Sequence, residues 1–571
     1  MRIRLRHCLW IAGLLAIPGV QASPQSTDAL QRADAAFKAG YAAMQSGDLD
    51  AARNQFATAA QLAPQLPETH VALGAILVQM GRPAEAINEL QTALKLKPDD
   101  PIAETNLSVA EEAAAQASVA AGNLVDAEIH LRAALDAASS SSTTTDPNRK
   151  ALLEDKLGAL LAQQQRWREA ATEFRESLQS NPAGVQAATT HMHLGATLAA
   201  EKEYPPALLE LTSAVEAAPA NAVAQYELGR VLAASGQDDE ALPHLEKALQ
   251  LDANLHGAAL ELAMAEQRLG KQEESILLFH KAVDQDPKNA MALTNLGLAL
   301  TETGKAREAI PFYLRALAET PADPVVHEDL GVAYLQQSDF DNAIIQFEKA
   351  RELDAANPQL HYDLGLAYKL KDRVNDAVAE LLSAARLGPS LPDPPYTLGI
   401  LYMQVGRLQD AAAQLRVALA LRPENGDGWA ILGSVLKQLN QQDDAVAALR
   451  RAIELLPGQP GPHITLAGVL AEQGKHDEAT AERKIAADLS RTAVNHQRAM
   501  LSTNAGNQLL QRGAIADAVE KYTDAIAADP GYTEAHRQLA VAYSQQGRSA
   551  EAEAERAKAQ GQAQTQTGEK P

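Results

Sequence analysis

The sequence repeats one pattern with a constant period of 34 residues. Between residues 222 and 460 successive copies follow one another without an insertion or a deletion. A constant period requires that one structural unit be built many times over, so it constrains the fold more than any other feature. The copies begin at Ala222, His256, Ala290, Pro324, Pro358, Pro392, Gly426 and Pro460.

Each copy contains two helical patterns separated by a short break. Apolar residues at positions 7, 11 and 14 lie on one face of a first helix, and those at positions 20, 24 and 27 on one face of a second. Positions 15 to 18 are rich in Gly, Asp and Asn, which favours a tight turn. A proline at position 32 ends the second helix. Each copy is therefore predicted to be a helical hairpin, and because one hairpin cannot bury its own apolar face, the hairpins must stack into a solenoid.

The pattern resembles the tetratricopeptide repeat. It has Leu-Gly at positions 7 and 8, Tyr at position 11 in Tyr334, Tyr368 and Tyr402, Ala at positions 20 and 27, and Pro at position 32. The resemblance implies an all-α fold, a right-handed superhelical solenoid of about 14 helix-turn-helix repeats. The sequence departs from the family at position 4, where Trp is typical and Trp429 is the one example.

Histidine occupies position 4 in several copies. Successive copies place these rings about 8–10 Å apart, too far for them to share a zinc ion, which binds nitrogen at roughly 2 Å. We therefore expect the histidines to pack between the two helices of their hairpins. They are His70, His191, His327, His361, His463 and His536.

The N-terminus, residues 1–22, has the pattern of a cleaved signal peptide. Three arginines precede an apolar run from Cys8 to Ile17, and a small-x-small site ends at Ala22. The run is well short of the roughly 20 residues that span a bilayer, so we expect no stable membrane insertion after cleavage. The sequence predicts an exported, periplasmic protein; the alternatives are a secreted protein or one held at the membrane by an uncleaved signal. The mature chain would contain no cysteine.

Interruptions of the period predict the domain organisation. In the third copy the second helix arrives seven residues late, which indicates a lengthened first helix, and residues 484–503 indicate an extended helix or connector. The Ser/Thr-rich residues 137–150 have the composition of a flexible linker. The predicted parts are an N-terminal block of about three repeats (23–136), this linker (137–150), a central block of about ten repeats (151–486), a C-terminal block with its connector (487–560) and a disordered tail (561–571).

Charge and motifs exclude several functions. The formal net charge is −23, and removal of the three signal arginines makes it −26. Such an acidic surface is a poor partner for nucleic acid. We find no phosphate-binding loop, no His-Glu-x-x-His motif and no nucleophile elbow. The sequence therefore predicts no enzyme, with no catalytic residues, no cofactor and no metal.

The candidate binding site lies on the face of the first helices opposite the packing face. At 100° per residue, position 9 points away from positions 7 and 11, and it is apolar in five successive copies. In the family this face lines a concave groove for peptides, so the resemblance implies a groove with an apolar floor and an acidic margin. The alternative is that neighbouring first helices bury these groups among themselves. The candidates are Met264, Leu298, Val332, Leu366 and Ile400 at position 9, Glu227, Glu261, Asn295, Asp329 and Asp363 at position 6, and Tyr226, Tyr362 and Tyr396 at position 5.

These observations favour a non-catalytic scaffold for protein–protein interaction. Its partners would be proteins or peptides with apolar and basic side chains, which complement an acidic groove. The alternative is a periplasmic component of an envelope export or polysaccharide-secretion machine.

Overall fold

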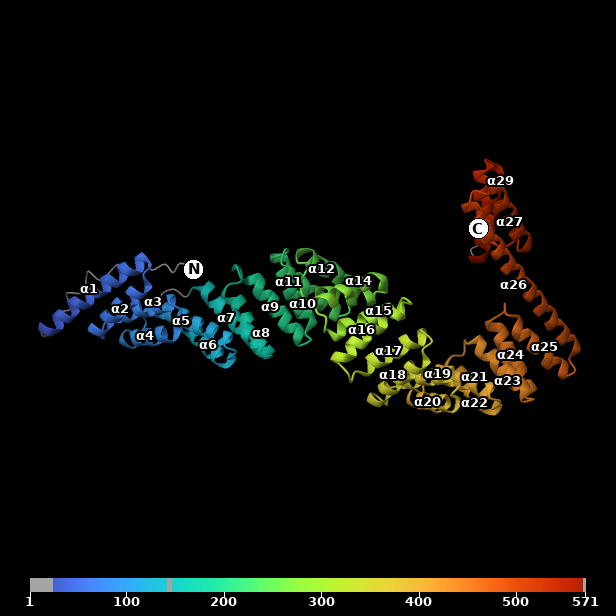
Figure 1. The fold of residues 1–571 in the computed structure, drawn as a ribbon, viewed down its shortest axis with the longest axis horizontal. Coiled ribbons are helices and arrows are strands. Elements are labelled where there is room, and N and C mark those ends of the chain that lie inside the picture. The colour runs from blue at the N-terminus through green and yellow to red at the C-terminus, as the bar shows by residue number, and fades with distance from the viewer. Residues whose placement is uncertain (1–23, 141–145, 568–571) are drawn as a thin grey trace. The chain divides into compact units, whose positions relative to one another are not determined.

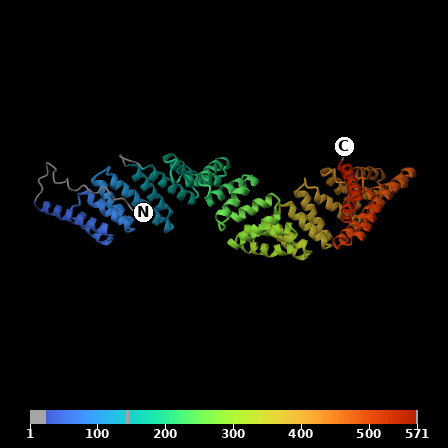
Figure 2. The ribbon, with the colours of Figure 1, turned by 90° about the horizontal axis from the view of Figure 1, so that it is seen from above.

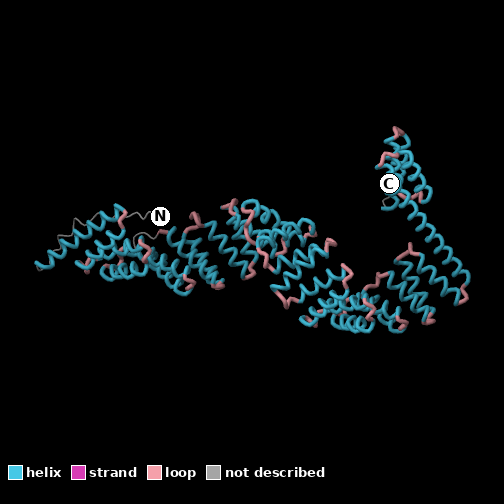
Figure 3. Tube along the Cα trace, viewed as in Figure 1, coloured by secondary structure: helices cyan, strands magenta, loops and turns pink. Residues whose placement is uncertain are grey.

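The computed structural model describes residues 24–140 and 146–567. Within these ranges every regular element is a helix, and short loops join the helices (Figure 3). The predicted signal peptide, residues 1–22, lies outside the described residues. The chain forms two compact units that divide between Thr303 and Gly304, inside the repeat that begins at Ala290. Each unit is an all-α stack of helical hairpins.

Unit 1 comprises the residues up to Thr303. Its helices α1 to α14 form seven hairpins, and α15 is its last helix (Figure 1). The two helices of each hairpin lie side by side in both ribbon views, and each second helix contacts the first helix of the next hairpin (Figure 2). The helices are α1 (Pro24–Ser46), α2 (Leu49–Leu62), α3 (Pro67–Gln79), α4 (Pro83–Leu96), α5 (Pro101–Ala120), α6 (Leu124–Ser140), α7 (Pro147–Gln163), α8 (Trp167–Ser180), α9 (Ala187–Ala200), α10 (Tyr204–Ala217), α11 (Ala222–Ala234), α12 (Asp238–Leu251), α13 (Ala258–Arg268), α14 (Gln272–Gln285) and α15 (Ala290–Glu302).

Unit 2 comprises the residues from Gly304 on and begins with α16. Helices α17 to α29 form seven hairpins, because the long helix α26 pairs with α25 through its first part and with α27 through its last part. The helices are α16 (Ala306–Glu319), α17 (Pro324–Gln336), α18 (Phe340–Leu353), α19 (Pro358–Leu370), α20 (Val374–Leu387), α21 (Asp393–Gln404), α22 (Leu408–Leu421), α23 (Gly426–Gln438), α24 (Gln442–Leu455), α25 (Pro460–Glu472), α26 (His476–Gln511), α27 (Ile515–Ala528), α28 (Thr533–Gln545) and α29 (Ser549–Thr567).

Glycine at position 8 lets the two helices of a hairpin approach closely. A Cβ atom built on Gly229 would lie 2.6 Å from Cγ of Leu245, and one on Gly331 would lie 2.6 Å from Cε1 of Phe347. The partner in each case is the side chain at position 24, which is fully buried in both hairpins. The Leu-Gly pair of the repeat therefore sets the distance between the two helices.

The turn between the two helices requires a left-handed backbone at position 15. Glycine supplies it in most copies, for example Gly236 with φ of 81° and Gly406 with φ of 79°. In five copies another residue adopts the same conformation, with φ between 56° and 63°, at some cost in strain. These residues are Gln165, Lys202, Ser338, Asp372 and Asn440.

Two predicted details of the helices are confirmed, and two are corrected. Helix α5 has 20 residues where most first helices have 13, as the late second helix indicated, and residues 484–503 lie inside the 36-residue helix α26. The predicted boundary between residues 486 and 487 therefore falls within a continuous helix, because the chain has no Pro or Gly between His476 and Ala505 to end it. The predicted disordered tail is wrong for residues 561–567, which continue α29, since Gln and Ala favour helix.

The predicted linker is helical at both ends. Helix α6 continues to Ser140, with Ala137 buried, and α7 begins at Pro147. The Asp146 carboxylate accepts a hydrogen bond from the Asn148 amide at 3.0 Å and so caps α7. Residues 141–145 lie outside the described residues, and the other predicted block boundaries remain predictions.

Candidate functional site

All thirteen candidate groove residues lie on first helices, and all are half-buried. The unit boundary divides them into two sets. Unit 1 holds Tyr226 and Glu227 on α11, Glu261 and Met264 on α13, and Asn295 and Leu298 on α15. Unit 2 holds Asp329 and Val332 on α17, Tyr362, Asp363 and Leu366 on α19, and Tyr396 and Ile400 on α21.

The sequence left two alternatives open: an accessible groove, or burial of these side chains between neighbouring first helices. Partial burial lies between the two. First helices of neighbouring hairpins contact each other, as α13 and α15 do in unit 1 and α17 and α19 in unit 2. Val332, Tyr362 and Tyr396 pack against the core of unit 2, and Tyr226 packs against that of unit 1. Neighbouring helices therefore cover part of each side chain. The part that remains accessible is a candidate contact surface, and the groove remains a prediction.

In unit 1 the acidic residues of this face are paired with an arginine. Arg230 on α11 donates hydrogen bonds to the Glu227 carboxylate from Nε at 3.0 Å and from Nη2 at 2.5 Å. Glu261 on α13 faces the same guanidinium: burial raises the pKa of the Glu261 carboxyl, and Arg230 opposes that rise. Burial, followed by the charges of Glu261 and Glu227, raises the pKa of Tyr226 to about 12. This face therefore holds two carboxylates around one guanidinium.

In unit 2 the corresponding face is crowded with carboxylates. Burial raises the pKa of Glu328 on α17 to about 7, and Asp363, Asp329 and Asp354 add to the effect. Burial also raises the pKa of Asp363 on α19 to about 6, although the Gln359 amide donates to its two oxygens at 3.1 and 3.2 Å. A cation beside these groups would lower both pKa values and stabilise the charged forms.

Sequence reasoning missed three residues that define these two faces. Glu328 occupies position 5, the same register position as Tyr226, and the register alone could have found it. Arg230 occupies position 9 in the copy before the five apolar ones, and the sequence does not show that it contacts Glu227. Gln359 is recognisable only from its hydrogen bonds to Asp363, one helical turn away.

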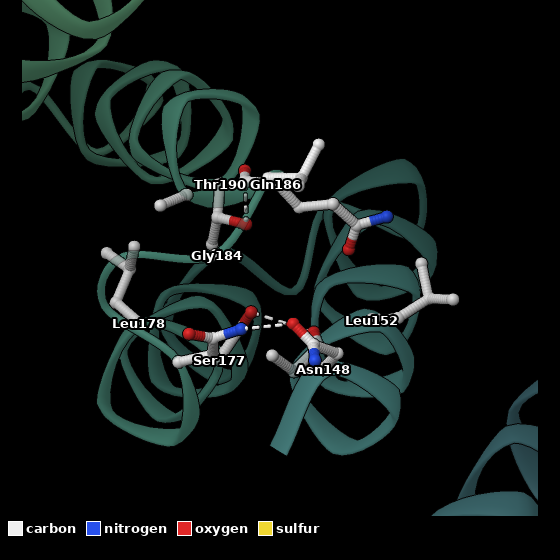
Figure 4. Close-up of a pocket in the computed structure, with 11 residues that line it drawn as sticks. Asn148, Leu152, Ser177, Leu178, Gly184, Gln186 and Thr190 are labelled. Atoms are coloured by element: carbon white, nitrogen blue, oxygen red, sulfur yellow. Dashed lines mark hydrogen bonds between the residues drawn. The ribbon is translucent and has the colours of Figure 1, made fainter. Parts of the chain in front are cut away.

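Unit 1 also contains a cavity of about 420 Å³ beside α7, α8 and α9 (Figure 4). The copies that begin at Ala151 and Ala188 are 37 residues apart, and the loop between α8 and α9, residues 181–186, has six residues where most loops between hairpins have four. Asn181 Nδ2 donates to Asn148 Oδ1 at 2.6 Å, and both residues line the cavity. The buried Ser177 hydroxyl donates to the Ala151 carbonyl at 2.7 Å. The cavity lies outside the predicted groove, and none of its lining residues is charged.

A second cavity, of about 430 Å³, lies in unit 2 beside α26 and α28. His496 Nδ1 lies 2.7 Å from the Asp529 carboxylate, and its ring packs edge-on against Tyr532 at a centroid distance of 5.1 Å. Arg537 pairs with Glu534 at 3.3 Å at the rim. The charged groups of this cavity are therefore largely paired with one another.

The position-4 histidines pack inside their hairpins, as predicted, and each faces a side chain on the second helix. Five of them, His70, His327, His361, His463 and His536, are buried between their two helices. Within the part of the chain that the structure describes, no three His, Cys, Asp or Glu side chains gather so that they could hold a metal ion. Across the same residues, no helix combines the length and the apolar character that a membrane span needs.

Structural comparisons return helical repeat proteins at low similarity. MamA from Desulfovibrio magneticus RS-1 is 24% identical over 30% of this chain and 96% of its own, with a TM-score of 0.29. A tetratricopeptide repeat protein from Parabacteroides merdae ATCC 43184 is 19% identical over 46% of this chain and 98% of its own, with a TM-score of 0.33. YrrB, described as a TPR protein with an unusual peptide-binding site, is 21% identical over 34% and 97%, with a TM-score of 0.30. No curated protein sequence matches this chain significantly.

Family models of the tetratricopeptide repeat match the sequence at several places. One matches residues 43–105 and 509–567, a second matches residues 198–256, 260–324 and 396–460, and a third, described as TPR repeat, matches residues 333–372. Together these ranges cover more than half of the chain and fall in both units. Repeats of this kind form extended surfaces on which other proteins bind. The chain belongs to the tetratricopeptide repeat family.

Proposed function

We propose that this protein is a non-catalytic scaffold that binds an extended, basic segment of a partner protein along the first helices of unit 2. The segment would lie across α17, α19 and α21. Its lysine or arginine side chains would approach Glu328, Asp329 and Asp363, and its apolar side chains would contact Val332, Leu366 and Ile400. A single face would then recognise both classes of side chain.

One observation carries this proposal: carboxylates of α17 and α19 crowd together while partly removed from water. Burial raises the pKa of Glu328 to about 7 and that of Asp363 to about 6, so charging these groups costs free energy in the unbound protein. A bound ammonium or guanidinium group would recover that cost, whereas an acidic segment would increase it. Electrostatic complementarity of this kind selects partners by the sign of their charge.

The apolar residues beside the carboxylates supply the second part of the recognition. Val332 and Leu366 are half-buried on consecutive first helices, and Tyr362 lies between them in the sequence. An apolar side chain placed on them would cover the area that the helices leave accessible, at about 25 cal/mol per Å² of apolar surface. Peptides that combine basic and apolar residues should therefore bind more tightly than peptides that carry either kind alone.

The test is selection of peptides on the full chain, followed by titration of the selected peptides. A library of random extended peptides should yield sequences with alternating basic and apolar residues. The double variant Glu328→Gln, Asp363→Asn should then bind these peptides at least tenfold more weakly, because it removes the negative charge without changing side-chain shape.

A matched control separates this local effect from the overall charge. The double variant Glu352→Gln, Asp376→Asn makes the same change of net charge on second helices α18 and α20, where both carboxylates are exposed. For the apolar part, Leu366→Lys is compared with Leu382→Lys, since Leu382 is exposed on α20. Equal weakening by both members of either pair would place binding elsewhere than on the first helices.

We also propose that the protein acts outside the cytoplasm, after cleavage of residues 1–22. The support is the pattern of arginines, apolar run and small-x-small site in the sequence. A role within an envelope export or polysaccharide-secretion machine is the second proposal, with the same binding surface. A reporter enzyme active only after export, fused behind residues 1–30, tests the location: activity is expected, and an inactive, stable fusion would contradict it.

A further inference from the structure

A histidine at position 4 and a glutamate at position 23 form a recurring contact across the hairpin. The two residues are 19 apart in the sequence, and the histidine Nδ1 lies 2.5–2.7 Å from a glutamate oxygen in every case. We name this contact the His–Glu clamp. Its members are His70–Glu89, His191–Glu210, His361–Glu380, His463–Glu482 and His536–Glu555.

In three clamps the second ring nitrogen also faces an acceptor. Nε2 lies 3.2 Å from the Pro64 carbonyl in His70, 3.2 Å from the Ala355 carbonyl in His361 and 3.0 Å from the Pro530 carbonyl in His536. These carbonyls belong to the loop that leads into the first helix, six residues before the histidine. Each of these rings therefore ties the incoming loop to the second helix.

A neutral imidazole cannot satisfy both acceptors. It carries one N–H group, so its other nitrogen would direct a lone pair at a carbonyl or a carboxylate oxygen. The imidazolium ion carries two N–H groups and donates to both. A buried acceptor left without a donor costs about 1–3 kcal/mol. The geometry of these three clamps is thus complete only when the histidine and glutamate share an extra proton, as in an imidazolium ion beside a carboxylate.

We infer that the His–Glu clamps of His70, His361 and His536 are proton-dependent contacts, which stabilise hairpins in both units when the histidine and glutamate share an extra proton. When the pair loses that proton, one acceptor is left without a donor and the hairpin is less stable. Stability from these three clamps therefore falls as the pH rises.

The chain contains its own uncharged version of the clamp. His327 has Nδ1 2.7 Å from Gln346 Oε1 and Nε2 3.3 Å from the Pro321 carbonyl. Rotation of the Gln346 amide presents its NH₂ group to a neutral ring, so a neutral His327 satisfies both contacts. A glutamine at position 23 therefore preserves the structure and removes the requirement for a proton.

The fourth hairpin has two carboxyl groups at the same register positions. Glu154 at position 4 is fully buried, and Glu173 at position 23 is half-buried. Burial raises the pKa of both, and the charge of Glu154 adds to the rise at Glu173. A carboxyl whose pKa is raised on folding holds a proton that the unfolded chain releases, so its contribution to stability also falls as the pH rises. This hairpin therefore responds to pH in the same direction as the clamps.

The clamp of His70 is the best place for a test, because Glu89 has no other charged partner among the described residues. By contrast, Glu380 also pairs with Arg351, and Glu555 with Lys558. The other charged groups on α3 and on the helices and loops packed against it are Glu68 on α3, Asp50 and Arg53 on α2, Arg82 and Lys97 with Asp99 and Asp100 in the loops, Glu85 and Lys95 on α4, and Glu104, Glu111 and Glu112 on α5. Among these groups, burial raises the pKa of Glu104. Glu104 is present in both the wild type and the variant compared below.

The experiment is hydrogen exchange of the full chain, followed by mass spectrometry of peptides from α3 and α4. Glu89→Gln copies the His327–Gln346 arrangement and is expected to fold. At pH 5.5 the wild type should protect these helices about tenfold more than the variant, after correction for intrinsic exchange rates. At pH 7.5 this advantage should be gone, and the variant should be protected at least as well as the wild type, because glutamine satisfies a neutral ring.

The reverse substitution provides an independent check. Gln346→Glu should create a clamp at His327 and make the protection of α17 and α18 depend on pH, with about tenfold more protection than the wild type at pH 5.5. Equal protection at pH 5.5 in both comparisons would overturn the inference, as would a difference in protection of the same size at both pH values. In the last case the contact would be a pH-independent hydrogen bond.

Discussion

The first-helix faces of the two units are built from the same register positions but differ in how their charges are paired. In unit 1, Arg230 bonds to Glu227 and faces Glu261. In unit 2, the charged groups that act on Glu328 are Asp363, Asp329 and Asp354, and all of them are carboxyls. On the first face an arginine offsets the carboxylates, whereas on the second the neighbouring carboxyls raise the pKa of Glu328 further. The same register positions can therefore carry two different charge arrangements.

The largest expected effect comes from forcing apart the two helices of one hairpin, α17 and α18, in unit 2 only. In Gly331→Leu the new side chain would meet Phe347, whose nearest atom is 2.6 Å from a Cβ at this position. We expect a loss of about 3 kcal/mol in the stability of the surrounding helices, together with loss of peptide binding. Gly229→Leu makes the equivalent change against Leu245 in unit 1 and should leave binding unchanged. Hydrogen exchange and peptide titration check both; loss of binding in both variants would argue against a site confined to unit 2.

A smaller effect follows from making unit 1 resemble unit 2. Arg230→Met keeps most of the side-chain volume and removes the positive charge between Glu227 and Glu261. We expect a cost of about 1–2 kcal/mol in the local stability of α11 and α13, because two partly buried carboxylates lose their partner. The same variant should gain weak affinity for the basic peptides selected by unit 2. Local exchange rates and titration measure the two effects, and an unchanged affinity would mean that carboxylates alone do not create the site.

The pH dependence of unit 2 provides a third comparison. The pKa of Glu328 is raised to about 7, so the folded protein binds a proton that the unfolded chain releases, and stability falls as the pH rises from about 4 toward 7. After allowance for partial exposure, we expect about 1 kcal/mol. Glu328→Gln should reduce this pH dependence of stability, measured as hydrogen-exchange protection of α17 and α19. If the variant keeps the full pH dependence, groups other than Glu328 are responsible for it.

The smallest expected effect concerns the turns, which the two units share. Lys202→Gly in unit 1 and Asp372→Gly in unit 2 remove a side chain from a left-handed residue, with φ of 63° and 56°. Each should stabilise its hairpin by about 0.5–1 kcal/mol, and by similar amounts. Thermal unfolding of the two variants is the measurement. A gain in one unit alone would show that the turns are not equivalent.

Sequence periodicity predicted most of the fold because each repeat position has a local physical role. Gly331 and Phe347 meet since positions 8 and 24 face each other, and the turn requires a left-handed residue at position 15 wherever the copy occurs. The extended helix α26 follows from a segment without Pro or Gly. The extent of α29 was missed because polar composition resembles both an exposed helix and a disordered tail.

The site was less predictable, because its properties depend on contacts between helices. Register placed Asp363 and Leu366 on one face but could not show that both would be half-buried. Register did not identify Arg230 as the partner of Glu227, since the pairing depends on side-chain conformation. The position-4 histidines were correctly predicted to pack, whereas their contacts at position 23 emerge only when the two helices are placed side by side.

Proton release on binding tests the central claim most directly. At pH 6.5, between the pKa of about 6 for Asp363 and about 7 for Glu328, both groups are partly protonated in the unbound protein. Calorimetric titration with a selected Lys-containing peptide, repeated in two buffers of different ionisation enthalpy, measures the protons exchanged. We predict net proton release by the wild type and none by the variant Glu328→Gln, Asp363→Asn. Binding of the peptide to the wild type without proton release would contradict the account, because the carboxylates of unit 2 would then not be the groups that receive the cation.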